Sequence, residues 1–473
     1  MSTEATNRQA AVALAEALGN LPLALEQAAA YTAQTGISLA DYLELFRERA
    51  ARYTPPATPS ADYPAALAVT FELAFTKIRE DSPAAADLLT LCAFLAPDDV
   101  PLESFKEGVK KERAEAAPPE SLAYAVANPE ALAAAAATLQ AYAFVKVRGG
   151  SFLSMHRLIQ AVARDRLGDD ERKKSAEVAV TLIHAAFRYN PRDTRTWPPS
   201  ARLLQHALIV AEHARTLGVV VKLTSILLNN LGAYLFNNAE LVEAQAALEK
   251  SVALREELLG PTHPELAASL DNIGQTLIRQ GKLDEAAEYL KRALAMDEEA
   301  LGPDHPNVAV RLNNIGEVLR ERGAYDDARR HYERALAIFE ALPGPTHEDI
   351  PTILNNIGLT LHAQDDLKSA RTYYERALLI DEASDPNHPN VAIDLNNLGS
   401  ALAILGDVDT ARQHLERALR ICLEHLGKKH PLTLTVKRHL GELGRRAAGG
   451  SSSEESATAA AEVENPEDED AAE

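Results

Sequence analysis

Five histidines recur at nearly constant intervals in the second half of the chain, and imidazole is a common metal ligand. They are His263, His305, His347, His388 and His430, spaced 42, 42, 41 and 42 residues apart. Each begins a separate sequence unit, so successive rings should lie about 10 Å apart, the usual distance between packed helices. Zinc needs its ligands about 2.0–2.1 Å from one centre. We therefore predict no metal site, and expect each histidine to make a turn-stabilising hydrogen bond.

A second set of polar residues has the same period and could bind a peptide. It consists of Asn229, Asp271, Asn313, Asn355 and Asn396. A short amide can both donate to and accept from an extended peptide backbone. The alternative is that these side chains cap or bridge neighbouring helices. We expect that bridging role mainly of the residues that follow them: Asn230, Asn272, Asn314, Asn356 and Asn397.

The elements that must position these side chains form a repeat. The segments "LNNLG", "LDNIG", "LNNIG", "LNNIG" and "LNNLG" end at Gly232, Gly274, Gly316, Gly358 and Gly399, and a fixed period of this length indicates stacked units. Each unit reads as two helices, because apolar residues recur at spacings of three and four. Small residues such as Gly316, Ala328 and Ala335 should let the paired helices approach closely.

One stripe of each first helix should face away from this packing. In the third unit it includes Asn313, Glu317 and Arg320. Toward the C-terminal end the stripe becomes apolar, with Leu359, Ile393 and Ile404. We expect the apolar anchor of a ligand to bind there.

This pattern resembles the tetratricopeptide repeat (TPR), and its period, its "LNNLG" run and its "G-x-x-H-P" linker resemble repeats of the kinesin light chain type. The resemblance covers residues 225–446. It implies an all-α fold, a right-handed TPR superhelix (α-solenoid) whose first helices line a concave groove. In the resembled repeats, the asparagine ladder holds ligand peptides.

The first half of the chain has no such period. A proline-rich break, "RYTPPATPSADYP", precedes several helical segments, and "GG" then separates two short β-prone runs in "AFVKVRGGSFLSMHR". Gly-Gly between such runs is typical of a hairpin. Helices closed by one small β-hairpin suggest a winged-helix-like domain over residues 65–170, followed by a helical connector over residues 171–224.

Two short motifs in this half resemble bacterial NB-ARC (STAND-class) switch ATPases that carry TPRs. "GNLPLAL" is similar to their GLPL motif, so residues 1–51 resemble a helical remnant of the end of that module. "MHR" stands where the family has Met-His-Asp, and Arg157 replaces the family's Asp. The resemblance implies that Pro22 would pack on adenine and that His156 would reach the β-phosphate of ADP.

The phosphate-binding loop G-x-x-x-x-G-K-[ST] is absent from the sequence. Without the N–H groups and lysine of that loop, nothing offsets the desolvation of a triphosphate. We predict no ATP hydrolysis by this chain alone and no cofactor. For Pro22 and His156 a structural role is the leading interpretation, and a residual nucleotide contact is the alternative.

Composition excludes several function classes. The formal net charge of -21 disfavours nucleic acid as a partner. No apolar stretch is long enough to span a bilayer, and the polar N-terminus has no signal peptide, so we expect a cytoplasmic protein without a membrane partner. Residues 447–473 are rich in acidic and small residues, and should form a disordered tail.

The sequence therefore predicts a non-enzymatic interaction protein. Its repeats should bind a peptide or protein partner as the sensor or scaffold part of a signalling regulator. The alternative is a subunit of a split NB-ARC switch ATPase whose P-loop lies on a separate chain. Transcriptional regulation through the winged helix is a weaker interpretation, because its helix lacks a basic cluster.

Overall fold

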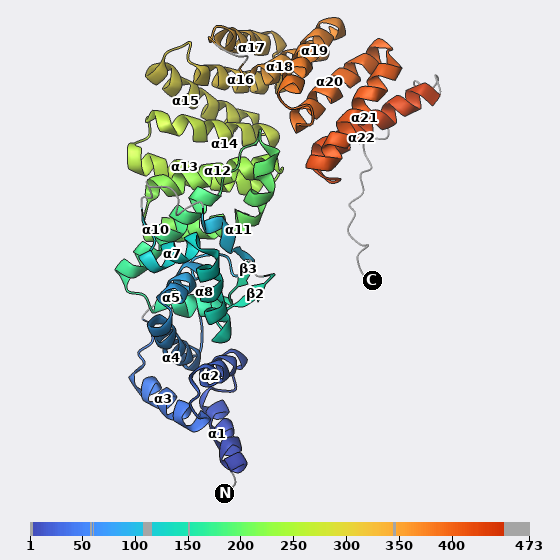
Figure 1. The fold of residues 1–473 in the computed structure, drawn as a ribbon. Helices are drawn as coiled ribbons and strands as arrows, with labels where there is room; N and C mark the ends of the chain where they lie inside the picture. Colours follow the sequence, from blue (N-terminus) through green and yellow to red (C-terminus); the bar gives the residue numbers. More distant parts are fainter. Residues whose placement is uncertain are drawn as a thin grey trace. The chain divides into compact units, whose positions relative to one another are not determined.

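The computed structural model describes residues 3–56, 59, 61–106, 116–149, 152–343 and 347–448 (Figure 1). The chain divides into two compact units, residues 1–301 and 302–473. Both are built of helices, and one small sheet belongs to the first unit, so the all-α prediction is confirmed.

The first unit begins with three helices: α1 (Thr3–Ala17), α2 (Pro22–Thr35) and α3 (Leu39–Arg52). Pro22 opens α2, where its missing N–H costs no helical hydrogen bond. Ser38 and Asp41 form a capping box that starts α3. Leu18 and Tyr42 are fully buried in a core that these helices share. The "GNLPLAL" segment is thus a helix junction.

The next part of the unit holds further helices and the sheet. The helices are α4 (Ala65–Asp81), α5 (Pro83–Cys92), the 3-10 helix η1 (Leu102–Phe105), α7 (Glu120–Ala127), α8 (Pro129–Ala141) and α9 (Arg157–Asp165). Residues 53–64, where the proline-rich break was predicted, contain no helix or strand in their described part.

The sheet has three strands: β1 (Val100–Pro101), β2 (Lys146–Arg148) and β3 (Phe152–Ser154). β2 and β3 pair antiparallel, with Val147 opposite Leu153, so the predicted hairpin is present. β1 joins the other edge of β3, and sequence analysis did not predict this strand. Two residues are too few to show a period.

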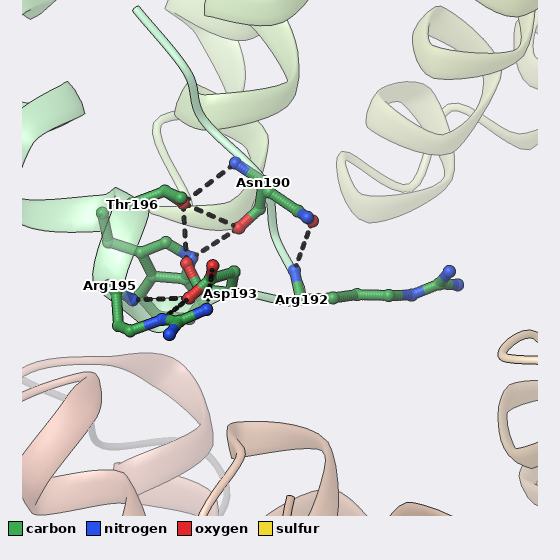
Figure 2. Close-up of polar contacts among 6 residues, drawn as sticks. Asn190, Arg192, Asp193, Arg195 and Thr196 are labelled. Atoms are coloured by element: carbon green, nitrogen blue, oxygen red, sulfur yellow. Dashed lines mark hydrogen bonds and ion pairs between the residues drawn. The ribbon is translucent and has the colours of Figure 1, made fainter. Parts of the chain in front are cut away.

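Two long helices follow, α10 (Asp169–Ala186) and α11 (Trp197–Leu217). Figure 2 shows the polar contacts of the loop between them. The Thr196 hydroxyl accepts from the Asn190 backbone N–H at 3.0 Å, and Asp193 accepts from Arg195 Nε at 2.8 Å. Because Thr196 directly precedes α11, these contacts fix the start of that helix. The 3-10 turn η2 (Thr194–Thr196) lies within the same loop.

The repeats begin in the first unit with α12 (Val221–Asn237), α13 (Leu241–Leu259), η3 (Pro264–Leu266), α14 (Ala267–Arg279) and α15 (Leu283–Leu301). The second unit contains α16 (Pro306–Glu321), α17 (Tyr325–Glu340), α18 (Ile350–Ala363), α19 (Leu367–Ser384), α20 (Pro389–Leu405), α21 (Val408–His425) and α22 (Pro431–Ala448). Each repeat is a pair of these helices, as predicted, and α22 is the first helix of one more.

The paired helices of each repeat pack closely against each other at a glycine of the first helix. A Cβ added to Gly316 would lie 2.6 Å from the Tyr332 ring, and one added to Gly358 would lie 2.5 Å from the Tyr374 ring. Both tyrosines are fully buried. These glycines are therefore required because the partner helix lies so close. Their backbone is helical and has no positive φ.

The predicted acidic tail falls almost wholly outside the described residues. α22 continues to Ala448, two residues into the segment predicted as tail, and residues 449–473 are not described. Among the described residues, no helix is both long and apolar enough to cross a membrane.

Candidate functional site

The five periodic histidines each accept a backbone hydrogen bond at or just before the start of a helix, which confirms the hydrogen bonds expected of them. In each case the ring Nδ1 accepts from the backbone N–H two residues later, at 3.1 Å for His305 and His388 and at 3.2–3.3 Å for His263, His347 and His430. An N-cap acceptor satisfies one of the otherwise unpaired N–H groups of a helix start. In the part of the chain that the structure describes, no group of three or more potential ligands could hold a metal ion.

In the first unit, the amide positions lie at the contact between two first helices. Asn229 of α12 accepts from the Ser269 hydroxyl at 3.0 Å and from Asn272 Nδ2 at 3.1 Å, and both donors belong to α14. Asp271 is buried and accepts from Gln275 at 2.9 Å. Asn229 therefore bridges two repeats.

The same bridge recurs in the second unit. Asn356 of α18 donates to Asn313 of α16 at 2.9 Å, and Asn397 of α20 donates to Asn355 of α18 at 3.2 Å. Asn355 in turn donates to the buried Asp394. The sequence led us to expect that mainly the second asparagine of each pair would bridge neighbouring helices. These hydrogen bonds use both members of the pair.

The last bridge uses a different residue type. His439 Nδ1 and Asn396 Oδ1 lie 2.8 Å apart, which places the imidazole of α22 where the earlier repeats have an asparagine. Asn313, Asn355 and Asn396 are only 5–8% exposed. Their side chains are thus held in fixed orientations by the neighbouring repeat, and any ligand must meet them at their small exposed edges.

The residues predicted to flank these amides differ in exposure. Leu359 is half-buried, whereas Ile393 and Ile404 of α20 are 40% and 47% exposed. Their spacing of 11 residues, three helical turns, places them on one face of α20. An exposed isoleucine pair on one helix face is a surface that a partner's apolar side chain can cover.

The two charged residues predicted for the stripe lie on α16. Glu317 is half-buried. Arg320 pairs with Glu321 at 2.5 Å, and only 20% of its side chain is exposed. Burial lowers the pKa of Arg320, but Glu321 and Tyr332 outweigh it and raise that pKa above its usual value. Arg320 therefore stays charged and lies against the buried tyrosines of the repeat more than it faces solvent.

One periodic contact was missed by the sequence analysis. It is made by one arginine in each of the second helices α15, α17, α19 and α21: Arg292, Arg334, Arg376 and Arg417. In the first unit Arg292 donates to Glu256 at 2.6 Å and to the Pro261 carbonyl at 2.5 Å. Arg334 and Arg417 donate to the carbonyls of Pro303 and Pro386. The signal was present, because these arginines recur at the same period as the histidines.

The two motif residues of the first half lie in the same unit, each at the start of a helix. Pro22 is exposed at the start of α2. His156 caps α9, with Nδ1 accepting from the Leu158 N–H at 3.2 Å. A cavity of about 740 Å³ brings the two motifs together, since its lining includes Leu23 of α2 together with His156 and Arg157. Pro22 itself does not line this cavity.

Comparisons with known proteins fit this arrangement of helices. The tetratricopeptide repeat family matches five overlapping segments, 223–299, 277–341, 310–383, 349–424 and 395–455. Residues 76–172 match a domain of unknown function (DUF7779). A nucleotide-binding leucine-rich repeat (NLR)-like protein of Hyaloscypha variabilis is 24% identical over 276 residues, which are 54% of this chain. The chain spans 25% of the length of that relative.

Solved structures of similar chains include BtubC (BKLC) from P. vanneervenii, with 22% identity, a TM-score of 0.37, and coverage of 50% of this chain and 93% of that one. TPR-like repeats described as those of a kinesin light chain of Podosopora anserina have 21% identity and a TM-score of 0.34, covering 43% and 96%. The apo form of RapI has 15% identity and a TM-score of 0.36, covering 53% and 93%. From the family match and the helix pairs described above, the segment from residue 223 to the end of α22 consists of tetratricopeptide repeats.

Proposed function

We propose that the repeats capture a peptide or protein partner on the face of the first helices that carries Asn355, Asn396, Ile393 and Ile404. The observation that carries this proposal is the exposed isoleucine pair of α20 beside an ordered row of amides. Exposed apolar side chains gain free energy when a partner covers them, at about 25 cal/mol per Å². Repeats of this class serve as protein-interaction scaffolds, and no catalytic step is part of the proposal.

The partner's chemistry follows from this face. An apolar side chain would cover Ile393 and Ile404, while the amides would contact the backbone of an extended segment. Each asparagine amide carries two N–H groups, and the bonds described for Asn396 use one, toward Asn397. The amides are already fixed by their neighbours, so binding would order few additional side chains.

The proposal is tested with a peptide selected from a displayed random library against the full chain. Ile404→Asp should weaken its affinity at least tenfold, because a buried unpaired carboxylate is costly. The matched control is Leu379→Asp on α19, since Leu379 is 70% exposed and lies on a second helix. Equal effects of the two variants, or an effect of Leu379→Asp alone, would contradict the placement.

We further propose that these repeats are the sensor or scaffold part of a larger signalling regulator. The NLR-like relative, of which this chain spans a quarter, supports that context. In this proposal residues 65–170 form a winged-helix-like domain and residues 171–224 connect it to the repeats. The three-stranded sheet next to α9 supports a wing.

A second candidate function is suggested by the cavity beside His156. Its lining includes three basic residues, Lys146, Arg148 and Arg157, which could contact a phosphate-bearing ligand. That would fit a subunit of a split switch ATPase. Calorimetric titration of the full chain with ADP tests it: micromolar affinity that is lost in Arg157→Glu supports a nucleotide site, and no heat of binding leaves His156 as a helix cap only.

A further inference from the structure

Two carboxyl groups, one buried and one half-buried, lie at the junction of α19 and α20. Asp394 of α20 is only 1% exposed, and its Oδ1 accepts from Asn355 Nδ2 of α18. Its Oδ2 is buried and meets no N–H or O–H donor among the described residues. The Asp394 carboxyl nevertheless lies within hydrogen-bonding reach of the Asp381 carboxyl of α19. Two carboxyl groups can share a hydrogen bond only when one of them carries a proton.

The repeat architecture does not demand acids at these positions. One repeat earlier, the equivalents of Asp381 and Asp394 are Phe339 and Ile353, and both are buried. An apolar pair thus fits this junction, and it would avoid the cost of burying charge. Two repeats earlier the equivalents are Asp297 and Arg311, so these positions accept apolar and charged residues, and packing does not require two acids here.

The surroundings of Asp394 favour its neutral form. Burial, followed by the nearby Asp381 and Glu382 of α19, raises the pKa of the Asp394 carboxyl to about 8. From α18 the group that faces it is the neutral amide of Asn355, whose hydrogen bond lowers that pKa in part. Arg417 of α21 is paired with Glu382, so its charge is already matched.

The pair joins the helices that carry the proposed binding face. Asp394 directly follows Ile393, and Asn355, its donor, also accepts from Asn397. We propose that Asp381 and Asp394 form a proton-dependent latch that holds α18, α19 and α20 together and so makes partner binding depend on pH. With the proton present, the two acids share a hydrogen bond. When it is lost to solvent, the buried carboxylate of Asp394 and the half-buried carboxylate of Asp381 repel each other, and the junction opens more often.

This inference rests on the proposed function for its binding consequence, but the latch can be measured without a partner. Hydrogen exchange of the full chain, followed by mass spectrometry and corrected for intrinsic rates, reports the opening of α19 and α20. With a pKa of about 8 in the closed junction and an ordinary value of about 3.9 in the open one, linkage predicts about 25-fold more opening at pH 8.5 than at pH 6.5.

Two isosteric variants serve as the test. In Asp394→Asn the pH response of α19 and α20 should disappear, because no proton remains to be lost. In Asp381→Asn an amide can donate to Asp394, so the response should also be lost. α16 and α17 of the same chain are the internal control and should not respond. A wild-type chain without the response, or an unchanged response in both variants, overturns the latch.

The binding consequence is tested with the library-selected peptide. Its affinity should fall between pH 6.5 and pH 8.5 for the wild-type chain and stay constant for Asp394→Asn. If exchange responds to pH but affinity does not, the acids hold the junction without controlling binding, and the inference fails while the proposed function stands. If no selected peptide binds this face, the proposed function fails and the exchange result still decides the latch.

Discussion

The contact between Gly316 and Tyr332 allows the cost of one methyl group to be worked out. A Cβ at Gly316 would lie 2.6 Å from Cε1 and 2.9 Å from Cδ1 of the Tyr332 ring. The ring is fully buried, and close-packed surroundings leave it little room to move. Overpacking of this kind costs about 1–3 kcal/mol, while replacing glycine by alanine inside a helix gains up to about 1 kcal/mol. Gly316→Ala should therefore lower the free energy of opening by about 0–3 kcal/mol.

Gly441 provides the matched control. It also lies within a helix, α22, but a Cβ there would meet no atom within 4 Å. Gly441→Ala should stabilise its helix by up to about 1 kcal/mol, so the two variants should differ by about 1–3 kcal/mol. Native-state hydrogen exchange of α16 and α22 in the full chain measures both values, because repeats open locally. Equal stabilisation by the two alanines would refute the close-contact account.

Two further predictions concern histidines. His305→Ala should lower the stability of α16 by about 1 kcal/mol, because the cap to the Asn307 N–H is lost; His305→Asn, which retains a capping oxygen, should recover most of it, as hydrogen exchange of α16 would report. Burial and the nearby Arg164 lower the pKa of His213 to about 4, below its usual value of about 6.5. As the pH falls, the unfolded state therefore binds the proton before the folded state does. The folded state loses stability as the pH falls below about 6.5. Between pH 6.5 and pH 5 we expect a loss of about 1.5 kcal/mol in α11, which a variant such as His213→Gln should not show.

Much of the repeat region could be predicted because its signals recur. The histidine hydrogen bonds were expected from five copies of one linker, and the close contact at Gly316 from five copies of one segment. The roles of the paired asparagines were less accessible. Neighbouring positions on a helix point about 100° apart, and both members of a pair reach the same inter-repeat contact in this stack.

Features without a period were the ones that sequence analysis missed or misplaced. The element that follows β1 is the 3-10 helix η1, and its four residues are too few to show a helical period. β1 was missed because its two residues pair with β3, which lies some fifty positions later. The sequence around Asp394 does not predict its role, because that role depends on Asp381, and only helix packing brings Asp381 near it.

The central claim is that a partner binds the face of the first helices. The most direct test is photo-cross-linking of the selected peptide, carrying a benzophenone at its apolar anchor, to the full chain, with the linked residues mapped by mass spectrometry. The account predicts links to α20 around Ile393 and Ile404, and to α18 near Leu359. Links confined to the second helices α19 and α21 would contradict it.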